Sequence, residues 1–136
     1  MTLSDEMLHQ LVETANGVRR WAYIPYSHYA VGAALLTTSG KIYDGVNVEN
    51  ASFPNTVCAE RVAVVKAVSE GERSFQAIAV VTSNGGSPCG DCRQVLAEFG
   101  QDTLVIIADE TGKIHRQVTV QELLPGAFTP QNLLGE

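Results

Sequence analysis

Three cysteines and a glutamate are the residues of this chain whose types and spacing could do chemistry together. Cys58 begins a Cys-Ala-Glu triplet that ends at Glu60, and Cys89 and Cys92 belong to a Pro-Cys-x-x-Cys motif that begins at Pro88. These are the three cysteines of a chain of 136 residues. An odd number of clustered thiols is more typical of metal ligands, or of a reactive thiol, than of a disulfide framework.

Zinc is the metal that this set of ligands favours. Three thiolates bind the ion and leave one tetrahedral position open, as in catalytic sites, whereas a structural site usually closes with a fourth Cys or His. Glu60 is close enough in sequence to reach a water at the open position, where it could act as general base and then as general acid. Arg61 and Arg93, next to the ligand cysteines, could donate hydrogen bonds to the sulfurs and offset their negative charge.

Less specific interpretations of these residues remain open at this point. A Cys-x-x-Cys motif alone also occurs in redox dithiols and in structural zinc sites. Glu60 could be a solvated residue in the first turn of a helix, and Arg61 could form a surface ion pair of little energetic value. The three histidines, His9, His28 and His115, show no ligand-like spacing to the cysteines or to one another.

Helices and strands that could position the cysteines alternate along the chain. Apolar residues at helical spacing predict a first helix with Ser4 as N-cap, which Pro25 prevents from continuing further. Thr56 is a candidate N-cap for the second helix, and Pro88 suits the first turn of the third. The predicted elements are helices over 5–22, 58–70 and 88–99, and strands over 30–36, 41–48, 75–82, 103–108 and 113–120.

This order of elements, αββαβαββ, predicts a layered α/β fold. We expect a three-layer α/β/α sandwich: a mixed five-stranded sheet with helices on both faces, whose first and last strands are joined to their neighbours by hairpins. No repeat or linker interrupts the chain, so residues 1–136 are expected to form one domain. Both cysteine-bearing helices follow strands, and open α/β sheets bind ligands in the crevice beyond the strand ends. The cysteines should therefore converge there.

The composition is that of a globular protein with an acidic surface. The chain is 45% hydrophobic and 18% charged, and its formal net charge is −6. This charge repels phosphate backbones and argues against a nucleic acid partner, while a small uncharged or cationic substrate suits it better. We expect a cytoplasmic protein, because the N-terminal residues resemble no signal peptide and no apolar stretch is long enough to span a membrane.

The motif pattern is similar to that of the zinc nucleobase and nucleoside deaminases, with Cys58 in the position that carries His in some of them. Further blocks narrow the resemblance to the small, homotetrameric cytidine deaminases of the cytidine/deoxycytidylate deaminase superfamily. In chain order these blocks are Pro25-Tyr26-Ser27 with Val31-Gly32-Ala33-Ala34-Leu35, Gly45-Val46-Asn47-Val48-Glu49-Asn50-Ala51, Cys58-Ala59-Glu60-Arg61, Pro88-Cys89-Gly90-Asp91-Cys92-Arg93-Gln94 and Leu123-Leu124-Pro125-Gly126-Ala127-Phe128.

The resemblance implies a function and a role for each matching residue. It implies hydrolytic deamination of cytidine and 2′-deoxycytidine to uridine and 2′-deoxyuridine in pyrimidine salvage, by a zinc-bound hydroxide that attacks C4 and releases ammonia. The implied roles are one Zn²⁺ per subunit bound by Cys58, Cys89 and Cys92, proton transfer by Glu60, hydrogen bonds from Asn47 and Glu49 to the ribose 3′-hydroxyl, a ligand contact by Tyr29, and packing of Phe128 on the pyrimidine of a neighbouring subunit.

Two positions depart from the family pattern. Relatives often have Tyr where this chain has Phe53, so a hydrogen bond from that hydroxyl to the sugar is not expected here and the preference between ribose and deoxyribose is open. Relatives commonly have a small residue in the place of Asp91, whose charge would favour the first turn of a helix.

Three other functions compete with this interpretation. The substrate could be a related aminopyrimidine nucleoside such as blasticidin S, or the protein could edit DNA or RNA, or the zinc could serve folding alone. The net charge and the short turn over Asp109–Gly112 oppose polynucleotide editing, because relatives that act on polynucleotides typically insert a helix there.

Overall fold

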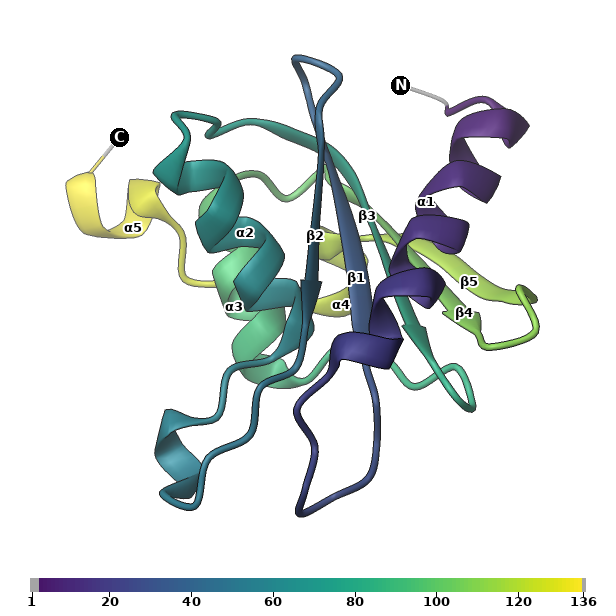
Figure 1. Ribbon diagram of the computed structural model, residues 1–136. Helices are drawn as coiled ribbons and strands as arrows, with labels where there is room; N and C mark the ends of the chain where they lie inside the picture. Colours follow the sequence, from purple (N-terminus) through teal and green to yellow (C-terminus); the bar gives the residue numbers. More distant parts are fainter. Residues whose placement is uncertain (1–2, 136) are drawn as a thin grey trace.

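The computed structural model describes residues 3–135 and contains the predicted mixed five-stranded sheet (Figure 1). The strand order is β2-β1-β3-β4-β5, in which β3 and β4 are parallel and every other neighbouring pair is antiparallel. The strands are β1 (Gly32–Thr37), β2 (Ile42–Val46), β3 (Phe75–Thr82), β4 (Leu104–Asp109) and β5 (Ile114–Thr119). The helices are α1 (Asp5–Val18), α2 (Ala59–Ser69), α3 (Gly90–Glu98), α4 (Val120–Leu123) and α5 (Pro130–Leu134), with 3₁₀ turns at Arg19–Trp21 and Phe53–Asn55.

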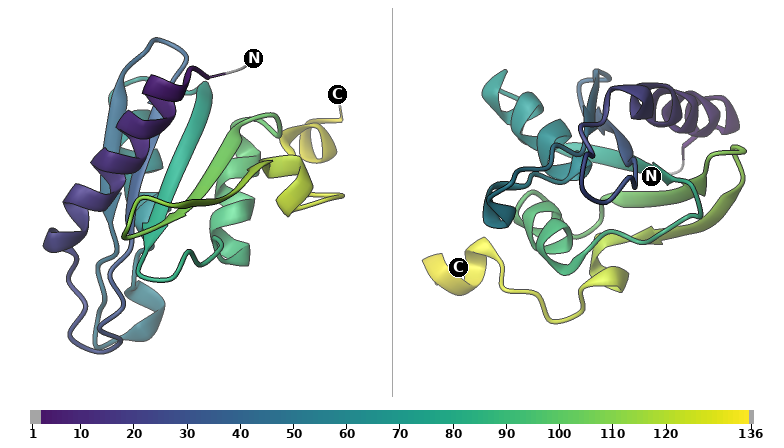
Figure 2. Two further views of the ribbon diagram at one scale, coloured as in Figure 1. Left: turned by 90° about the vertical axis from the view of Figure 1, so that its right-hand side faces the viewer. Right: turned by 60° about the horizontal axis from the view of Figure 1, so that its bottom comes forward.

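Helices cover both faces of the sheet, as the sequence predicts. Helix α1 lies on one face and α2 and α3 lie on the other (Figure 2). Alternate residues of each central strand enter the two cores, since successive side chains of a strand point to opposite faces. In β3, for example, Ile78 and Val80 pack under α2 and α3, while Ala79 and Val81 pack under α1.

The first helix is shorter than predicted. Ser4 caps it as expected, and its hydroxyl accepts a hydrogen bond from the Met7 backbone N–H. The α-helix ends at Val18, however, and the chain passes through a 3₁₀ turn before Ala22 becomes extended. Helical spacing of apolar residues does not separate a last α-helical turn from a 3₁₀ turn, so the predicted end at residue 22 is wrong.

The two helices that carry the cysteines begin at the cysteines themselves. Cys58 is the N-cap residue of α2, and Thr56, the predicted cap, instead accepts a hydrogen bond from the Asn50 backbone N–H. Cys89 is the N-cap residue of α3, so Pro88 precedes the helix and does not lie in its first turn. Neither cysteine side chain bonds its helix N-terminus. Both sulfurs are therefore directed elsewhere.

Helix α2 packs very closely on β2 at Gly45. A Cβ atom added at Gly45 would lie 2.5 Å from the Ala59 carbonyl oxygen and 2.7 Å from the Ala63 backbone nitrogen, both of which belong to α2. Only a residue without a side chain permits this distance. The contact fixes the first turn of α2, which follows Cys58, against the sheet.

Two short helices near the C-terminus were not predicted. Helix α4 begins with a capping box in which Thr119 and Glu122 bond each other's backbone N–H groups, and α5 follows Thr129. None of the helices between residues 3 and 135 is long and apolar enough to cross a lipid bilayer.

Candidate metal centre

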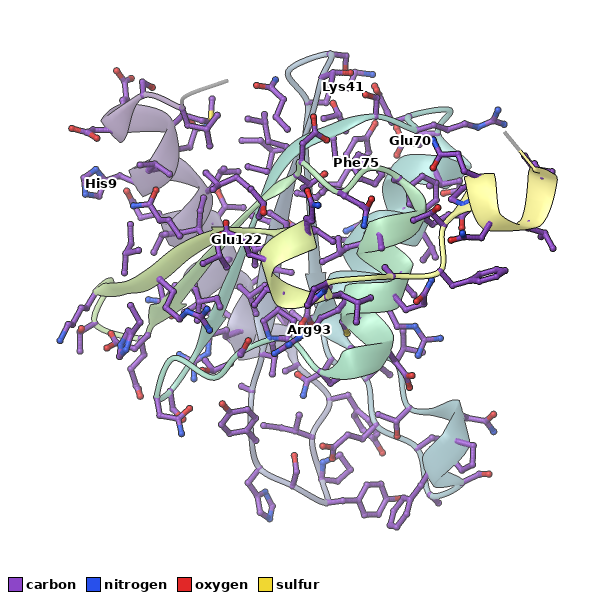
Figure 3. The ribbon with its side chains drawn as sticks, turned by 180° about the vertical axis from the view of Figure 1, so that it is seen from behind. His9, Lys41, Glu70, Phe75, Arg93 and Glu122 are labelled. Carbon is purple, nitrogen blue, oxygen red and sulfur yellow. The ribbon has the colours of Figure 1, made fainter. Side chains whose placement is uncertain are left out.

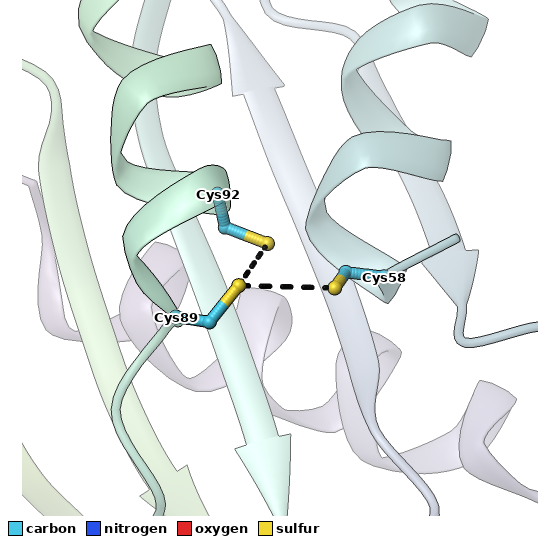
Figure 4. A group of neighbouring side chains, drawn as sticks. All are labelled: Cys58, Cys89 and Cys92. Carbon is cyan, nitrogen blue, oxygen red and sulfur yellow. Dashed lines mark hydrogen bonds between the residues drawn. The ribbon is translucent and has the colours of Figure 1, made fainter. Parts of the chain in front are cut away.

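The three cysteine sulfurs lie together at the N-terminal ends of α2 and α3 (Figure 4). The Sγ atoms of Cys58 and Cys89 are 3.9 Å apart, those of Cys89 and Cys92 are 3.5 Å apart, and all three lie within 4.8 Å of one another. Tetrahedral zinc with Zn–S bonds of about 2.3 Å holds its sulfurs roughly 3.8 Å apart. The observed spacing therefore fits one zinc ion, and the described residues add no fourth His, Cys, Asp or Glu to the group.

The topology of the sheet brings these sulfurs together. Strands β2 and β3 are both antiparallel to β1 and therefore run parallel to each other. Helix α2 follows β2 and helix α3 follows β3, so both helices start at the same edge of the sheet. This is the crevice at the carboxyl ends of the strands that the sequence predicted for the site.

The cysteine thiols differ in how readily they lose a proton in the metal-free protein. Hydrogen bonding with Cys92 lowers the pKa of Cys58 to about 7, against the opposing effects of burial and of Glu60, and the charge of Arg61 also lowers it. The same hydrogen bond raises the pKa of Cys92 well above its usual value, as does its burial. Of these two thiols, Cys58 is therefore the more acidic.

Glu60 is buried directly beside the sulfurs. Its side chain is only 4% exposed, and burial raises the pKa of its carboxyl group. A cavity of about 200 Å³ is lined by Glu60 together with Cys58 and Cys89. A carboxyl group that is desolvated in this way and faces a cavity can exchange protons with a molecule bound there.

Two predicted substrate contacts, Tyr29 and Asn47, line the same cavity. The amide of Asn47 donates to the Tyr29 carbonyl oxygen at 2.9 Å and accepts from the Val31 backbone N–H at 3.0 Å. The Tyr29 hydroxyl donates to the Asn84 side-chain oxygen at 2.7 Å. Asn47 therefore holds the segment 29–31 in place, and one N–H of its amide stays available to a ligand.

Glu49 lies beside a second hollow that adjoins the cavity at Thr56. Its carboxylate accepts hydrogen bonds from the backbone N–H groups of Tyr26 and Ser27 and from the Ser27 hydroxyl. These hydrogen bonds, that of the Ser27 hydroxyl first, lower the pKa of Glu49. The structure thus places Glu49 in the adjoining hollow and not in the cavity that Glu60 and Asn47 line. Phe53 lines this second hollow and packs edge-on against Tyr26, with ring centroids 6.2 Å apart.

Arg93 does not donate to a sulfur, which corrects one prediction. Its guanidinium group donates to the Pro88 carbonyl oxygen at 2.9 Å, the Leu123 carbonyl oxygen at 2.8 Å and the Ser87 hydroxyl at 3.0 Å. Figure 3 shows this side chain reaching from α3 toward α4. Carbonyl oxygens are stronger acceptors than sulfur, so Arg93 fixes the backbone before Cys89 instead. Arg61 is half-buried and acts on Cys58 through its charge.

Phe128 lies outside the set of residues that line the cavity of its own chain. Its ring is 59% exposed, and its carbonyl oxygen accepts a hydrogen bond from the Gln94 side chain at 2.8 Å. Asp91 is also exposed, in the first turn of α3 as expected.

Sequence reasoning missed one wall of the cavity. Thr82 at the end of β3, and Gly86 and Ser87 in the loop that follows, all line it. The Ser-Asn-Gly-Gly-Ser sequence indicates only a flexible loop. The position of Thr82 at the carboxyl end of a central strand was the one available signal.

A buried carboxyl group and two of three clustered thiols line one cavity of an α/β fold, and the cluster has no fourth protein ligand among the described residues; this combination is typical of zinc-dependent hydrolases. Within that class, this chain belongs to the cytidine and deoxycytidylate deaminase family. The sequence model of that family's zinc-binding region matches residues 5–108.

Curated relatives and solved structures agree with this assignment. The chain is 50% identical to a cytidine deaminase of Halalkalibacterium halodurans over 126 residues, which cover 90% of this chain and 95% of the relative. It is 48% identical to a cytidine deaminase of Sporosarcina psychrophila over 129 residues, which cover 93% and 94%. The crystal structure of a cytidine deaminase from Burkholderia pseudomallei superposes with a TM-score of 0.85 at 44% identity, covering 93% of this chain and all of the other.

A blasticidin-S deaminase of Bacillus cereus is a more distant relative, 34% identical over 130 residues, which cover 88% of this chain and 91% of the relative.

Proposed function

We propose that this protein is a zinc-dependent cytidine deaminase that converts cytidine and 2′-deoxycytidine to uridine and 2′-deoxyuridine with release of ammonia. The observation that carries the proposal is that the buried Glu60 lines the same cavity as Cys58 and Cys89. These two cysteines and Cys92 form a group of sulfurs whose spacing fits a zinc ion. High identity to named cytidine deaminases over most of both chains supports the choice of substrate.

The protein's own residues divide the chemistry between them. Cys58, Cys89 and Cys92 hold the zinc ion, which when bound supplies a Lewis acid that acidifies water. Glu60 would take one proton from water and pass it to N3 of the pyrimidine, and would then take the second proton from the same oxygen atom and pass it to the departing amine. Its raised pKa suits both steps, because burial makes the carboxylate a better proton acceptor and the group must also return the proton that it accepts.

Asn47 and Glu49 bind the sugar in this proposal. One N–H of the Asn47 amide has no partner among the described residues, and Glu49 stays ionised because its pKa is lowered. A donor and an acceptor side by side match a ribose hydroxyl, which can accept from one and donate to the other. Tyr29, which lines the same cavity as Asn47, contacts the ligand. Phe53 offers only an apolar ring, so it does not select for the 2′-hydroxyl.

We further propose that the active enzyme is a homotetramer in which Phe128 packs on the pyrimidine bound by a neighbouring subunit. The exposed ring of Phe128, outside the cavity of its own chain, supports this arrangement. Each subunit would act as one deaminase domain over residues 1–136. Pyrimidine salvage in the cytoplasm suits three reduced thiols, since a reducing compartment keeps them available to the metal.

The test combines metal content with ammonia release. Purified protein is assayed for zinc per chain and for ammonia from cytidine, 2′-deoxycytidine and blasticidin S at equal concentration. We expect one zinc per chain and release of ammonia from both cytosine nucleosides. Protein that holds stoichiometric zinc but releases no uridine from cytidine would contradict the proposal.

Blasticidin S is the second candidate substrate, and the similarity to the Bacillus cereus enzyme favours including it. It carries the same aminopyrimidine ring, so the chemistry at C4 would be unchanged. If blasticidin S has a much higher kcat/KM than cytidine, the sugar contacts assigned to Asn47 and Glu49 are wrong while the roles of the cysteines and Glu60 stand.

A further inference from the structure

The loop over residues 83–87, here called the cavity loop, forms the wall between Tyr29 and the metal centre. Asn84 accepts the hydrogen bond of the Tyr29 hydroxyl, and the Gly86 backbone N–H donates to the Thr82 hydroxyl at 2.8 Å. The loop approaches Tyr29 closely, because a Cβ atom at Gly86 would lie 2.6 Å from the Tyr29 hydroxyl oxygen. A shift of this loop would therefore change the shape of the proposed substrate site.

Different residues hold two parts of the cavity loop. The end next to Cys89 is held by Arg93, which donates to the Ser87 hydroxyl and the Pro88 carbonyl oxygen. In the middle of the loop Gly85 adopts a φ of 77°, and the imidazole of His115 on β5 covers it. A Cβ atom at Gly85 would lie 2.9–3.0 Å from three atoms of this ring. His115 thus leaves the loop little room to move toward β5.

Asp109 keeps the His115 ring in this position. One oxygen of the Asp109 carboxylate lies 2.7 Å from His115 Nε2. The other oxygen accepts from the backbone N–H groups of Thr111 and Lys113 and from the Thr111 hydroxyl. The turn after β4 thus fixes the carboxylate, the carboxylate fixes the imidazole, and the imidazole fixes Gly85.

We propose that His115 and Asp109 are positioning residues of the deaminase, which hold the cavity loop so that Asn84 can orient Tyr29 toward the bound nucleoside. This inference rests on the proposed function. The pair touches neither the sulfurs nor Glu60, and Arg93 holds the Cys89 end of the loop independently. Removal of the His115–Asp109 pair should therefore weaken substrate binding more than it slows the chemical step.

The experiment compares His115→Ala with His115→Phe in the full-length, zinc-loaded protein. His115→Phe keeps a ring over Gly85 and serves as the conservative variant. His9→Ala is the matched control, because His9 is an exposed histidine of α1 with no hydrogen bond to the loop (Figure 3). Zinc content, kcat and KM for cytidine, and hydrogen exchange of the amides of residues 83–87 are measured for each variant.

For His115→Ala we expect about a tenfold rise in KM with kcat changed less than about twofold, as for the loss of an interaction worth about 1.4 kcal/mol in binding. Exchange of the loop amides should accelerate while zinc stays at one per chain. His115→Phe should restore most of the amide protection and of the affinity, and His9→Ala should match the wild type.

Two results would overturn the inference. In the first, His115→Ala has the KM and the amide hydrogen exchange of the wild type. In the second, His115→Ala loses zinc and its kcat falls, which would mean that His115 and Asp109 support the metal centre itself. The outcome is separable from the proposed function: a wild-type protein without activity on cytidine would refute that function, while the exchange measurement would still test whether His115 holds the loop.

Discussion

Gly45→Ala tests whether close packing of α2 on β2 sets the geometry of the metal centre. The added methyl carbon would lie 2.5 Å from the Ala59 carbonyl oxygen and 2.7 Å from the Ala63 nitrogen, where at least 3.4 Å is ordinary. Both atoms belong to the backbone of α2, so no side-chain rotation relieves the overlap. Either α2 or β2 must retreat by the difference, 3.4 − 2.5 = 0.9 Å.

The expected cost follows from this displacement. Overpacking a well-packed core costs about 1–3 kcal/mol, which outweighs the gain of roughly 0.5–1 kcal/mol when Ala replaces Gly within a strand. For a protein of this size each kcal/mol lowers the melting temperature by about 3–5 °C. Thermal unfolding of the zinc-free protein, followed by circular dichroism, should therefore show a loss of several degrees.

Zinc retention then shows which element moves. If α2 retreats, Cys58 shifts relative to Cys89 on α3, and a chelator should remove the metal at a lower concentration than from the wild type. If the edge strand β2 bends away instead, zinc affinity stays near that of the wild type while stability still falls.

Gly17→Ala is the matched control, because it introduces the same methyl group in α1 with no heavy atom within 4 Å. Gly17 lies in the last turn of α1, where replacing glycine by alanine should leave stability unchanged or raise it by less than about 1 kcal/mol. The reasoning is refuted if Gly45→Ala melts at or above the wild-type temperature.

Three further predictions concern single side chains. Glu60→Gln should keep one zinc per chain and the wild-type fold but lower kcat by roughly 10²–10⁴-fold, which is the usual contribution of a general acid–base group. Glu98→Gln, on the exposed face of α3, should change neither the zinc content nor kcat. Full activity of Glu60→Gln would remove Glu60 from the mechanism. Phe128→Ala should raise KM for cytidine about tenfold without loss of zinc, because one aromatic stacking contact is lost. If light scattering shows that the wild-type protein is a monomer, the contribution of Phe128 across subunits is refuted. Asp109→Asn should destabilise the protein at pH 7 in urea titrations, and the difference from wild type should shrink as the pH falls below about 4. Hydrogen bonds, first that of the Thr111 hydroxyl and then that of His115, lower the pKa of Asp109. Its stabilising effect is therefore complete above the unfolded value of 3.8 and is lost progressively as the pH falls from there through the lower folded value. A difference independent of pH would contradict this account.

Much of the fold was predictable because its central strands are long apolar runs. The predicted strand over 75–82 coincides with β3, and the parallel pairing of β3 with β4 follows from the helix between them. The convergence of the three cysteines was predictable because their spacing along the chain places them at two helix starts, each of which follows a strand of the same sheet. The set of three thiols and the family pattern both indicated zinc, and the sulfur distances agree with it.

Other features depend on the direction of side chains, which spacing does not reveal. Arg93 follows a ligand cysteine, yet its guanidinium reaches oxygen acceptors contributed by Ser87, Pro88 and Leu123, the last from a distant segment. The capping box of α4 was visible in the sequence as Thr119-x-x-Glu122, but a helix of four residues is too short for apolar periodicity to indicate it. Nothing in the loop sequence indicated that Asn84 meets Tyr29.

The correction at Arg93 changes how negative charge is offset at the metal centre. Three thiolates around one dication leave a charge of −1, and an ionised Glu60 would add another. Arg93 donates to uncharged oxygen atoms, so it keeps its charge but makes no direct contact with a sulfur. Closer to the sulfurs, Arg61 contributes its charge, and the N-termini of α2 and α3 each contribute roughly half a positive charge. Two helix starts supply as much positive charge as one arginine, and they do so without side-chain entropy. They can act together only because β2 and β3 run parallel, so the electrostatics of this site depend on the order of strands in the sheet as well as on the residues beside the cysteines.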